Sequence, residues 1–308
     1  MWDAGDIMEK QSEYGKEFLT GLIKRNKLNY EELNELKELE SICNKHERLQ
    51  MKTYWQDVNE RAEEGTNDFL YIEDANIVGY LGVYDFGCQE VELIGMVHPN
   101  YRGKGIFRLL VCAAAEECRK RRIPKVLFIC DDKSLSGKAC INKLGAKYIF
   151  SDHKMEFYTI KNIYQNRETG RITLRRAKRE DENEHNYINH ICFHISNEEA
   201  KKDYQNSVDK NEILMYMVEV CGKIIGKIDV AVEKSVATIY QFGVLPEFRK
   251  QGYGREIINS VLKMLTEENY EKIVLEAASY NPHAMSLYRS CGFEEMGITN
   301  YYETTIFP

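Results

Sequence analysis

The chain has 308 residues, 43% of them hydrophobic and 30% charged, with a formal net charge of −7 and nine cysteines. The length suits two domains, the acidic balance disfavours general affinity for nucleic acid, and the lack of a CxxC pair or regular cysteine framework favours reduced thiols over disulfides. Because no apolar run reaches the ~20 residues of a membrane-spanning helix and the first residues do not resemble a signal peptide, we expect a cytoplasmic protein that does not enter a membrane.

The first half is predicted to consist of helices followed by alternating strands and helices. Apolar residues recur at helical spacing over residues 30–46, and residues 69–86 read as two strands joined at Asp74-Ala75-Asn76. The next predicted elements, in chain order, are a strand at 91–97, a helix at 105–122, a strand at 125–131, a helix at 134–144, and closing strands at 146–150 and 154–160.

The second half repeats this plan. It is predicted to contain a strand at 171–177, helices at 182–194 and 198–208, a hairpin at 213–232, a strand at 236–244, a helix at 252–269, a strand at 272–278, a helix at 282–290, and a last hairpin of 293–298 with 301–307. A mixed sheet with helices on its faces is therefore expected in each half.

The two halves are related by an internal duplication. Placing Val97–Arg102 (VHPNYR) over Val244–Arg249 (VLPEFR) also brings Gly105 onto Gly252 and Gly145 onto Gly292. The repeat is too long for a solenoid, so it predicts a duplicated domain. The halves meet in the polar stretch at residues 161–171, which gives an N-terminal domain over residues 1–163 and a C-terminal domain over residues 170–308.

Residues 241–255 (QFGVLPEFRKQGYGR) form the most informative segment. A strand breaks at Pro246, passes through a turn containing Gly252 and Gly254, and enters an amphipathic helix. Glycines let backbone N–H groups approach a ligand closely, and the helix N-terminus adds a partial positive charge, so the segment predicts a phosphate-binding loop. It contains neither the Gly-Lys-Ser/Thr of a P-loop nor the third glycine of a dinucleotide fingerprint.

This loop resembles the pyrophosphate-binding motif of the GNAT family, the Gcn5-related N-acetyltransferases, in its pattern Arg249-x-x-Gly252-x-Gly254. Residues 281–293 (NPHAMSLYRSCGF) resemble the next motif of that family, and the resemblance covers nearly the whole chain. It implies an α/β (α+β) protein of two tandem GNAT-like domains, each with a mixed, mostly antiparallel central sheet flanked by helices. It also implies an acetyl-CoA-dependent N-acetyltransferase that needs no metal.

The same resemblance implies how acetyl-CoA would bind. The backbone of Phe242 and Val244 would pair with the pantetheine arm, which Asn281 would also contact. Amides of the loop would hold the pyrophosphate, and the residues concerned are Arg249, Lys250, Gln251, Gly252, Tyr253, Gly254 and Arg255. The amine would then attack the thioester directly, with a strand amide near Val244 stabilising the oxyanion.

Two residues are expected to move protons. Tyr288 occupies the position of the family's general acid, and a phenol can donate to the departing sulfur. Glu276 lies in LEAASYN, a stretch similar to that of the ribosomal-protein N-terminal alanine acetyltransferases, in which this glutamate is the base. Each has a structural alternative: Tyr288 could simply pack, and Glu276 could face solvent at the sheet edge. The tail Asn300-Tyr301-Tyr302 also resembles the peptide acetyltransferases.

The N-terminal half is expected to be catalytically silent. It keeps Arg102 and Gly105, so it could still hold a CoA-like ligand. At the positions of Tyr288, Asn281, Glu276 and Gly254 it carries Ile141, Ser134, Ile129 and Phe107. Glu92 lies where some family members carry a base, but a glutamate paired to a neighbour is the expected role.

Several functions remain open at this stage. A non-catalytic acyl-CoA-binding or partner-binding module is the main alternative to an enzyme. His190 and His194, one helical turn apart, form only a weak metal signal with His185 or Cys192, while His194, Tyr187 and Tyr204 could shape acceptor choice. The acceptor is expected to be a small-molecule amine or a peptide, and the protein a monomer with an internal pseudo-dimer or a homodimer.

Overall fold

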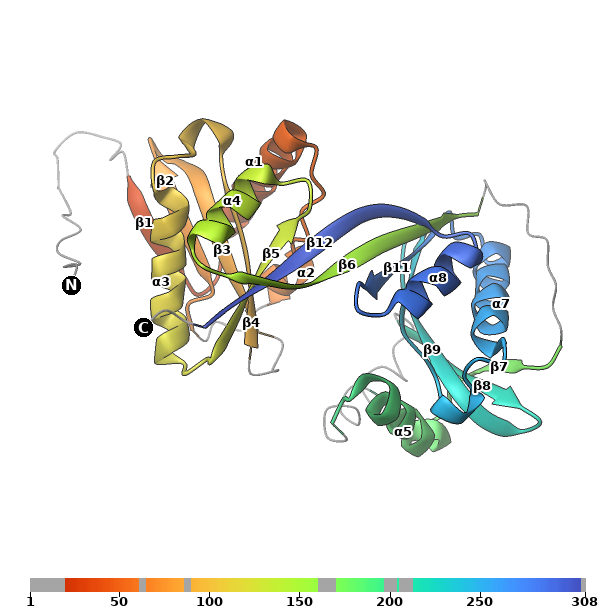
Figure 1. Ribbon diagram of the computed structural model, residues 1–308. Helices are drawn as coiled ribbons and strands as arrows, with labels where there is room; N and C mark the ends of the chain where they lie inside the picture. The colour runs from red at the N-terminus through yellow and green to blue at the C-terminus, as the bar shows by residue number, and fades with distance from the viewer. Residues whose placement is uncertain are drawn as a thin grey trace. The chain divides into compact units, whose positions relative to one another are not determined.

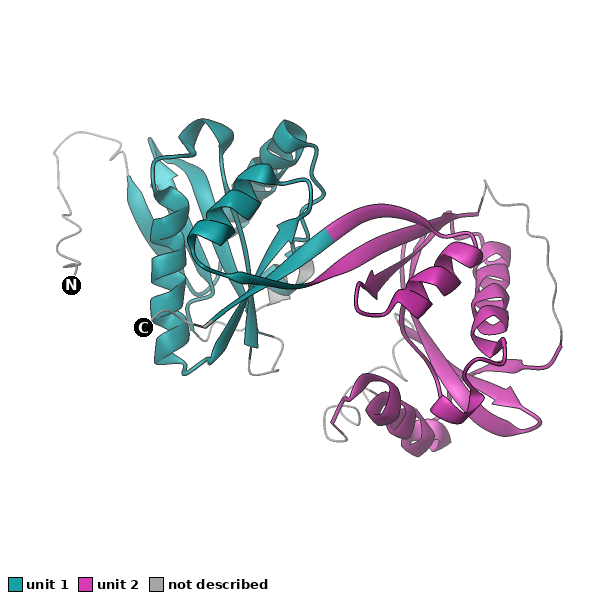
Figure 2. Cartoon of the chain, in the orientation of Figure 1, with its two compact units in different colours: residues 1–149, 299–308 teal, residues 150–298 magenta. Residues whose placement is uncertain are grey.

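The structure is a computed structural model that describes residues 20–60, 65–85, 90–159, 170–196, 204 and 213–305. It divides into two compact units (Figure 2). The first, here called the N-terminal unit, contains residues 1–149 and 299–308, and the second, the C-terminal unit, contains residues 150–298. The predicted helix at 198–208 lies outside the described residues except for Tyr204.

The N-terminal unit is a sheet with helices on both faces (Figure 1). Its elements are β1 (Gly21–Arg25), α1 (Tyr30–Glu47), α2 (Trp55–Glu60), β2 (Asp68–Glu73), β3 (Asn76–Asp85), β4 (Glu90–Val97), the short 3-10 helix η1 (Pro99–Tyr101), α3 (Ile106–Lys120), β5 (Lys125–Asp131) and α4 (Leu135–Lys143). The sheet order is β1-β2-β3-β4-β5, followed by residues 299–305 of strand β12. Only β4 and β5 run parallel among these pairs of described strands.

The C-terminal unit repeats this plan. Its elements are β7 (Thr173–Arg176), η2 (Arg179–Asp181), α5 (Glu182–Phe193), β8 (Ile213–Val220), β9 (Lys223–Glu233), β10 (Val236–Val244), η3 (Pro246–Phe248), α7 (Tyr253–Glu267), β11 (Lys272–Ala278) and α8 (Pro282–Ser290). The sheet order is β7-β8-β9-β10-β11, followed by strand β6 (Lys147–Tyr158), and β10 and β11 are parallel. Helices α7 and α8 pack on one face of the sheet and α5 packs on the other.

The two halves exchange their last strands. Met155 and Phe157 of β6, encoded in the first half, are buried in the core of the C-terminal unit, where β6 pairs with β11. Tyr302 of β12 (Glu294–Thr305), encoded in the second half, is buried in the core of the N-terminal unit, where β12 pairs with β5. Each unit is therefore completed by the other half of the sequence.

The last strands of the two halves differ from the predicted closing elements. The two closing strands predicted at 146–150 and 154–160 form one strand, β6. The last hairpin predicted in the second half also forms one strand, β12, because neither segment contains a tight turn between its two apolar stretches. The compact units divide after residues 149 and 298. The predicted domains of the sequence repeat, residues 1–163 and 170–308, stay a prediction. The sheet class itself, mixed and mostly antiparallel with flanking helices in each of two tandem domains, is confirmed.

Candidate active site

The candidate site of the C-terminal unit lies where two parallel strands stop pairing. β10 and β11 are paired from Val236 with Lys272 to Ile239 with Leu275. Both strands then continue, β10 to Val244 and β11 to Ala278, without further pairing between their described residues. Ligands of open α/β sheets bind at such carboxyl ends of parallel strands.

A β-bulge distinguishes this strand end from its counterpart. Tyr240 pairs with Asp229 and Gly243 pairs with Lys227, so β10 has one more residue than β9 in this interval. Gln241, within the bulge, has a φ of 43°, a left-handed conformation that is uncommon for a residue with a side chain. In the N-terminal unit, β3 and β4 pair in unbroken register from Gly79–Val97 to Asp85–Val91. Bulges redirect backbone groups, and here one does so beside the candidate site.

The glycine loop forms as predicted and leads into α7. Gly252 is the N-cap of the helix with a φ of 87°, and Lys250 before it has a φ of 60°. A left-handed cap residue favours glycine, and the amides of the following first turn have no acceptor within the helix. The segment thus presents N–H groups and the positive end of α7 at the carboxyl end of β10.

Arg249 has a structural role that the motif alone did not reveal. Its Nε donates to the carbonyl oxygen of Val244 at 2.7 Å, which ties the loop to the strand end. Arg102 makes the same bond to the carbonyl of Val97 at 3.0 Å. Both copies therefore keep this arginine because it closes the turn, so its presence in the N-terminal half does not by itself indicate phosphate binding.

Arg171 was missed by the sequence reasoning, although it lies against the glycine loop. Its guanidinium donates to Glu256 at 3.1 Å and to the carbonyl of Gln251 at 3.3 Å, and it stacks over the ring of Tyr253 at 4.9 Å. The Glu256 side chain is almost fully buried in α7. Arg171 lies 80 residues before Gln251 in the sequence, and no local pattern connects the two.

Tyr288 is buried beside the bulge. It projects from α8 between the rings of Phe242 and Phe293, with ring centroids 6.5 Å and 5.9 Å away. Burial raises the pKa of its hydroxyl to about 12, and the nearby Cys291 adds to this shift. The phenol therefore stays protonated at neutral pH, the state from which it can donate a proton.

Glu276 lies on the other face of the sheet from Tyr288. Its neighbours Leu275 and Ala277 point into the core that contains Tyr288, whereas Glu276 is exposed. Directly across from it on β6 is Lys154, a residue from the first half of the sequence. The structure therefore places the two predicted proton-transfer groups on opposite faces of the sheet.

Asn281 caps α8. Its Oδ1 accepts from the amide of Ala284 at 3.1 Å, and Ser134 makes the matching cap of α4 with the amide of Gly137, also at 3.1 Å. The capping role explains why a short polar residue stands here in both copies.

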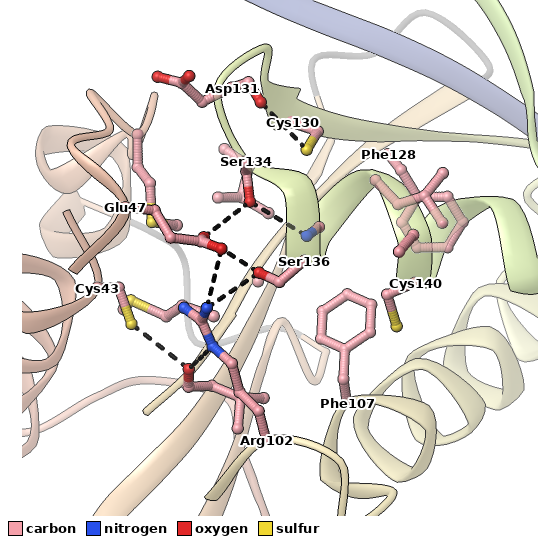
Figure 3. A pocket seen from close by; sticks show the side chains of 18 of the residues that line it. Cys43, Glu47, Arg102, Phe107, Phe128, Cys130, Asp131, Ser134, Ser136 and Cys140 are labelled. Atoms are coloured by element: carbon pink, nitrogen blue, oxygen red, sulfur yellow. Dashed lines mark hydrogen bonds and ion pairs between the residues drawn. The ribbon is translucent and has the colours of Figure 1, made fainter. Parts of the chain in front are cut away.

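The N-terminal unit contains a cavity of about 390 Å³ at the corresponding place between β4 and β5 (Figure 3). Its polar end is already neutralised, since Arg102 lies 3.2 Å from the carboxylate of Glu47 and both Ser134 and Ser136 donate to that carboxylate at 3.1 Å. Burial alone would raise the pKa of Glu47, but the bonds from Ser136 and the charge of Arg102 outweigh it, so the pKa lies below its usual value.

Other candidate residues have structural partners. The hydroxyl of Tyr54 donates to Glu92 at 2.8 Å, which confirms the expectation that Glu92 is paired to a neighbour. In the described ranges, His190 and His194 belong to no group of three metal-ligating side chains. Asn300, Tyr301 and Tyr302 belong to the N-terminal unit, where they pair with β5.

Comparison with known proteins agrees with this geometry. The acetyltransferase (GNAT) family matches the chain twice, over residues 30–146 and 164–293. The chain therefore belongs to the GNAT family, as a tandem member with two copies of the domain, which confirms the resemblance seen in the sequence.

Individual relatives cover only part of the chain. The [ribosomal protein bS18]-alanine N-acetyltransferase of Escherichia coli K12 is 36% identical over 70 residues, which are 22% of this chain and 47% of that protein. The spermidine N(1)-acetyltransferase of Vibrio cholerae is 31% identical over 104 residues, 32% of this chain and 60% of that protein. The chain thus spans about half the length of the curated relatives it matches.

Solved structures match the whole tandem fold. A GCN5-related N-acetyltransferase from Sphaerobacter thermophilus aligns with a TM-score of 0.81 at 18% identity, over 93% of this chain and 96% of that one. A tandem GNAT protein from the clavulanic acid biosynthesis pathway aligns with a TM-score of 0.69 at 14% identity, over 93% and 98%. In the part of the chain that is described, none of the helices combines the length and apolar character needed to cross a membrane.

Proposed function

We propose that the chain is an acetyl-CoA-dependent N-acetyltransferase that works in its C-terminal unit and transfers the acetyl group directly to a primary amine of a small molecule or peptide. The observation that carries the proposal is the combination at one strand end of a bulge in β10, a left-handed glycine cap on α7 and a buried, protonated Tyr288. The N-terminal unit has no counterpart of the bulge in its described strands or of the tyrosine.

Each group has a distinct role in the proposed reaction. Acetyl-CoA would supply the activated acyl group. Amides of the glycine loop and the N-terminus of α7 would hold its pyrophosphate, and Asn281 and the backbone of Phe242 and Val244 would hold the arm. Backbone amides at the bulge would stabilise the oxyanion, while Tyr288 would give its proton to the departing sulfur.

Glu276 is proposed to accept the proton of the attacking amine. Its exposed position on the sheet face opposite Tyr288 supports this assignment, because the base that serves the attacking amine and the acid that serves the departing sulfur must be separate groups.

The N-terminal unit is proposed to be non-catalytic. Its glycine loop is preserved at Gly105, with a φ of 84°, but Phe107 replaces Gly254 and Glu47 places a carboxylate beside Arg102. The Glu47 carboxylate already neutralises the Arg102 guanidinium, so this arginine attracts a phosphorylated ligand less than an unpaired one would. We therefore assign its cavity no role in acetyl transfer.

The proposed acceptor, a primary amine, is based on the substrates that appear in the names of two relatives. One is named for an alanine N-terminus of a ribosomal protein and another for spermidine, and both substrates offer a primary amine. The competing proposal, a non-catalytic acyl-CoA-binding or partner-binding module, gives no reason for the phenol of Tyr288 to lie beside the bulge.

The test is acetyl-CoA turnover, measured by thiol release over a panel of amines and N-terminal peptides, with the wild type and Tyr288→Phe. We expect an amine to stimulate release and the substitution to suppress it about 100-fold, while CoA binding by calorimetry stays within about threefold. Tight CoA binding without any amine-dependent release would favour the binding module. Absence of CoA binding would contradict the proposal.

A further inference from the structure

A cluster of buried polar side chains lies behind the bulge in the C-terminal unit. Lys227 on β9 is fully buried, and its Nζ lies 2.6 Å from Asp229, 2.8 Å from Gln241 and 2.9 Å from His185 Nε2. Asp229 and His185 are also almost fully buried. Lys227 thus connects strand β9, helix α5 and the bulge of β10.

The cluster is costly to the fold. Burial lowers the pKa of Lys227 below its usual value, although Asp229 opposes this shift. Within the described residues, Oδ1 of Asp229 and Oδ1 of Asn189 are buried without a hydrogen-bond partner. Buried charges and unpaired polar atoms each cost free energy that an apolar core would not.

The N-terminal unit shows what the same position looks like without these groups. Cys43 and Cys192 mark equivalent places on α1 and α5, since their thiols donate to the carbonyls of Val97 and Val244 at 3.5 Å and 3.6 Å. Two helical turns before them stand Leu36 in one copy and His185 in the other. Lys227 pairs with Gly243 on β10, and at the equivalent place in the N-terminal unit Tyr80 pairs with Met96 on β4. Lys227 therefore corresponds to Tyr80.

The contrast coincides with the bulge. Leu36, Tyr80 and Met96 pack together behind a regular β4, and the Tyr80 hydroxyl donates to the buried Asp68 at 2.8 Å and not to a residue of β4. His185 and Lys227 instead lie behind a bulged β10, and the Lys227 ammonium binds the side chain of Gln241, the left-handed residue of the bulge. A non-glycine residue in this conformation is strained by ~1–2 kcal/mol and needs support from its surroundings.

We propose that Lys227 is a positioning residue for acyl transfer: by binding Gln241 it holds the bulge of β10 in the conformation that presents its backbone amides to the thioester. The inference rests on the proposed function, because it assigns the bulge its role in that reaction. Lys227 itself is buried behind the sheet and acts through Gln241 without touching the substrate. Asp229 and His185 orient the ammonium.

The test must avoid leaving one buried charge alone. Lys227→Met by itself would strand Asp229, so we pair it with Asp229→Val, which removes both charges and fills the site with apolar atoms. In this double variant we expect kcat to fall about 10- to 100-fold and KM for acetyl-CoA to change less than about threefold, with the melting temperature kept. Leu265→Ala, fully buried at the far end of α7, is the stability control and should leave kcat near the wild-type value.

Adding Gln241→Gly to the double variant provides the decisive comparison. Glycine adopts a left-handed φ without an anchor, so kcat should rise at least about threefold above that of the double variant if Lys227 acts by supporting Gln241. No recovery, or a double variant with full kcat, would overturn the inference.

Hydrogen exchange separates this inference from the proposed function. Amides of residues 241–244 should exchange about tenfold faster in the Lys227→Met/Asp229→Val variant, while those of α7 stay protected. If the wild type acetylates no amine, the enzyme proposal fails, and exchange still decides whether Lys227 holds the bulge. Unchanged exchange at these amides would contradict its positioning role.

Discussion

At the scale of single residues, the properties of the candidate acid come from its surroundings. Position in the motif identified Tyr288, but only the packing of Phe242 and Phe293 around it explains why its pKa is raised to about 12. The neutral phenol therefore stabilises the fold fully below its usual pKa of 10.0, and this contribution is lost as the pH rises through about 12.

This shift predicts a pH-independent effect of Tyr288→Phe. Since the phenol stays protonated, the ratio of wild-type to variant kcat should be constant between about pH 7 and pH 10, at about 100. Steady-state kinetics across this range checks the prediction. A ratio that falls steadily above about pH 8 would show that the phenol ionises earlier and that its burial is relieved in the working enzyme.

Glu47 gives a second prediction at the same scale. Its pKa is lowered by Ser136, Arg102 and Ser134 against the effect of burial, so the stability it contributes is present above its usual pKa of 4.5 and is lost as the pH falls through the lower folded value. Glu47→Gln should lower the stability of the N-terminal unit at neutral pH and flatten its decline in acid.

Thermal unfolding as a function of pH tests this expectation, and hydrogen exchange of the amides in α3 reports on the N-terminal unit. Glu116→Gln is the matched control, because Glu116 also has a lowered pKa but forms an exposed pair with Lys24. Surface pairs contribute little, so this variant should follow the wild-type curve. Equal effects of the two substitutions would argue against a special role of the half-buried Glu47–Arg102 pair.

At the scale of elements, the sequence predicted most helices and strands that are marked by a local pattern. Glycine caps, apolar helical spacing and alternating strands located α3, α7 and the strands around them. The bulge escaped notice because it adds one residue to β10 and resembles ordinary strand sequence. The cluster around Lys227 was missed for a related reason: its members come from α5, β9 and β10, and no spacing pattern joins residues so far apart in the chain.

The two glycine caps allow a prediction with an internal control. Gly252 and Gly105 have nearly the same φ, 87° and 84°, and an added Cβ would meet only Arg171 Nη2 at 3.3 Å in the first case and no described atom within 4 Å in the second. Gly252→Ala and Gly105→Ala should each destabilise by ~1 kcal/mol. Only Gly252→Ala should weaken CoA binding, by about tenfold or more in calorimetry. Equal loss from both variants would place CoA in both units.

At the scale of the whole molecule, the exchange of β6 and β12 determines how the halves can be studied. A fragment ending near residue 160 would lack the strand that pairs with β5, so its inactivity would say nothing about the N-terminal unit. The silence of this unit is better tested in the full chain with Tyr288→Phe. Sequence alone could not reveal the exchange, because period-two patterns define a strand but not its partner.

The exchange predicts that each half of the sequence stabilises the opposite unit. Tyr302→Ala removes a buried ring, 7% exposed, from the N-terminal unit, and Phe157→Ala removes one, 2% exposed, from the C-terminal unit. Each should cost ~3–5 kcal/mol in the unit that contains the ring. Hydrogen exchange read by mass spectrometry should therefore show faster exchange in α3 and β5 for Tyr302→Ala, and in α7 and β11 for Phe157→Ala. CoA binding should weaken only in the second variant, and the opposite pattern would mean that each half folds on its own last strand.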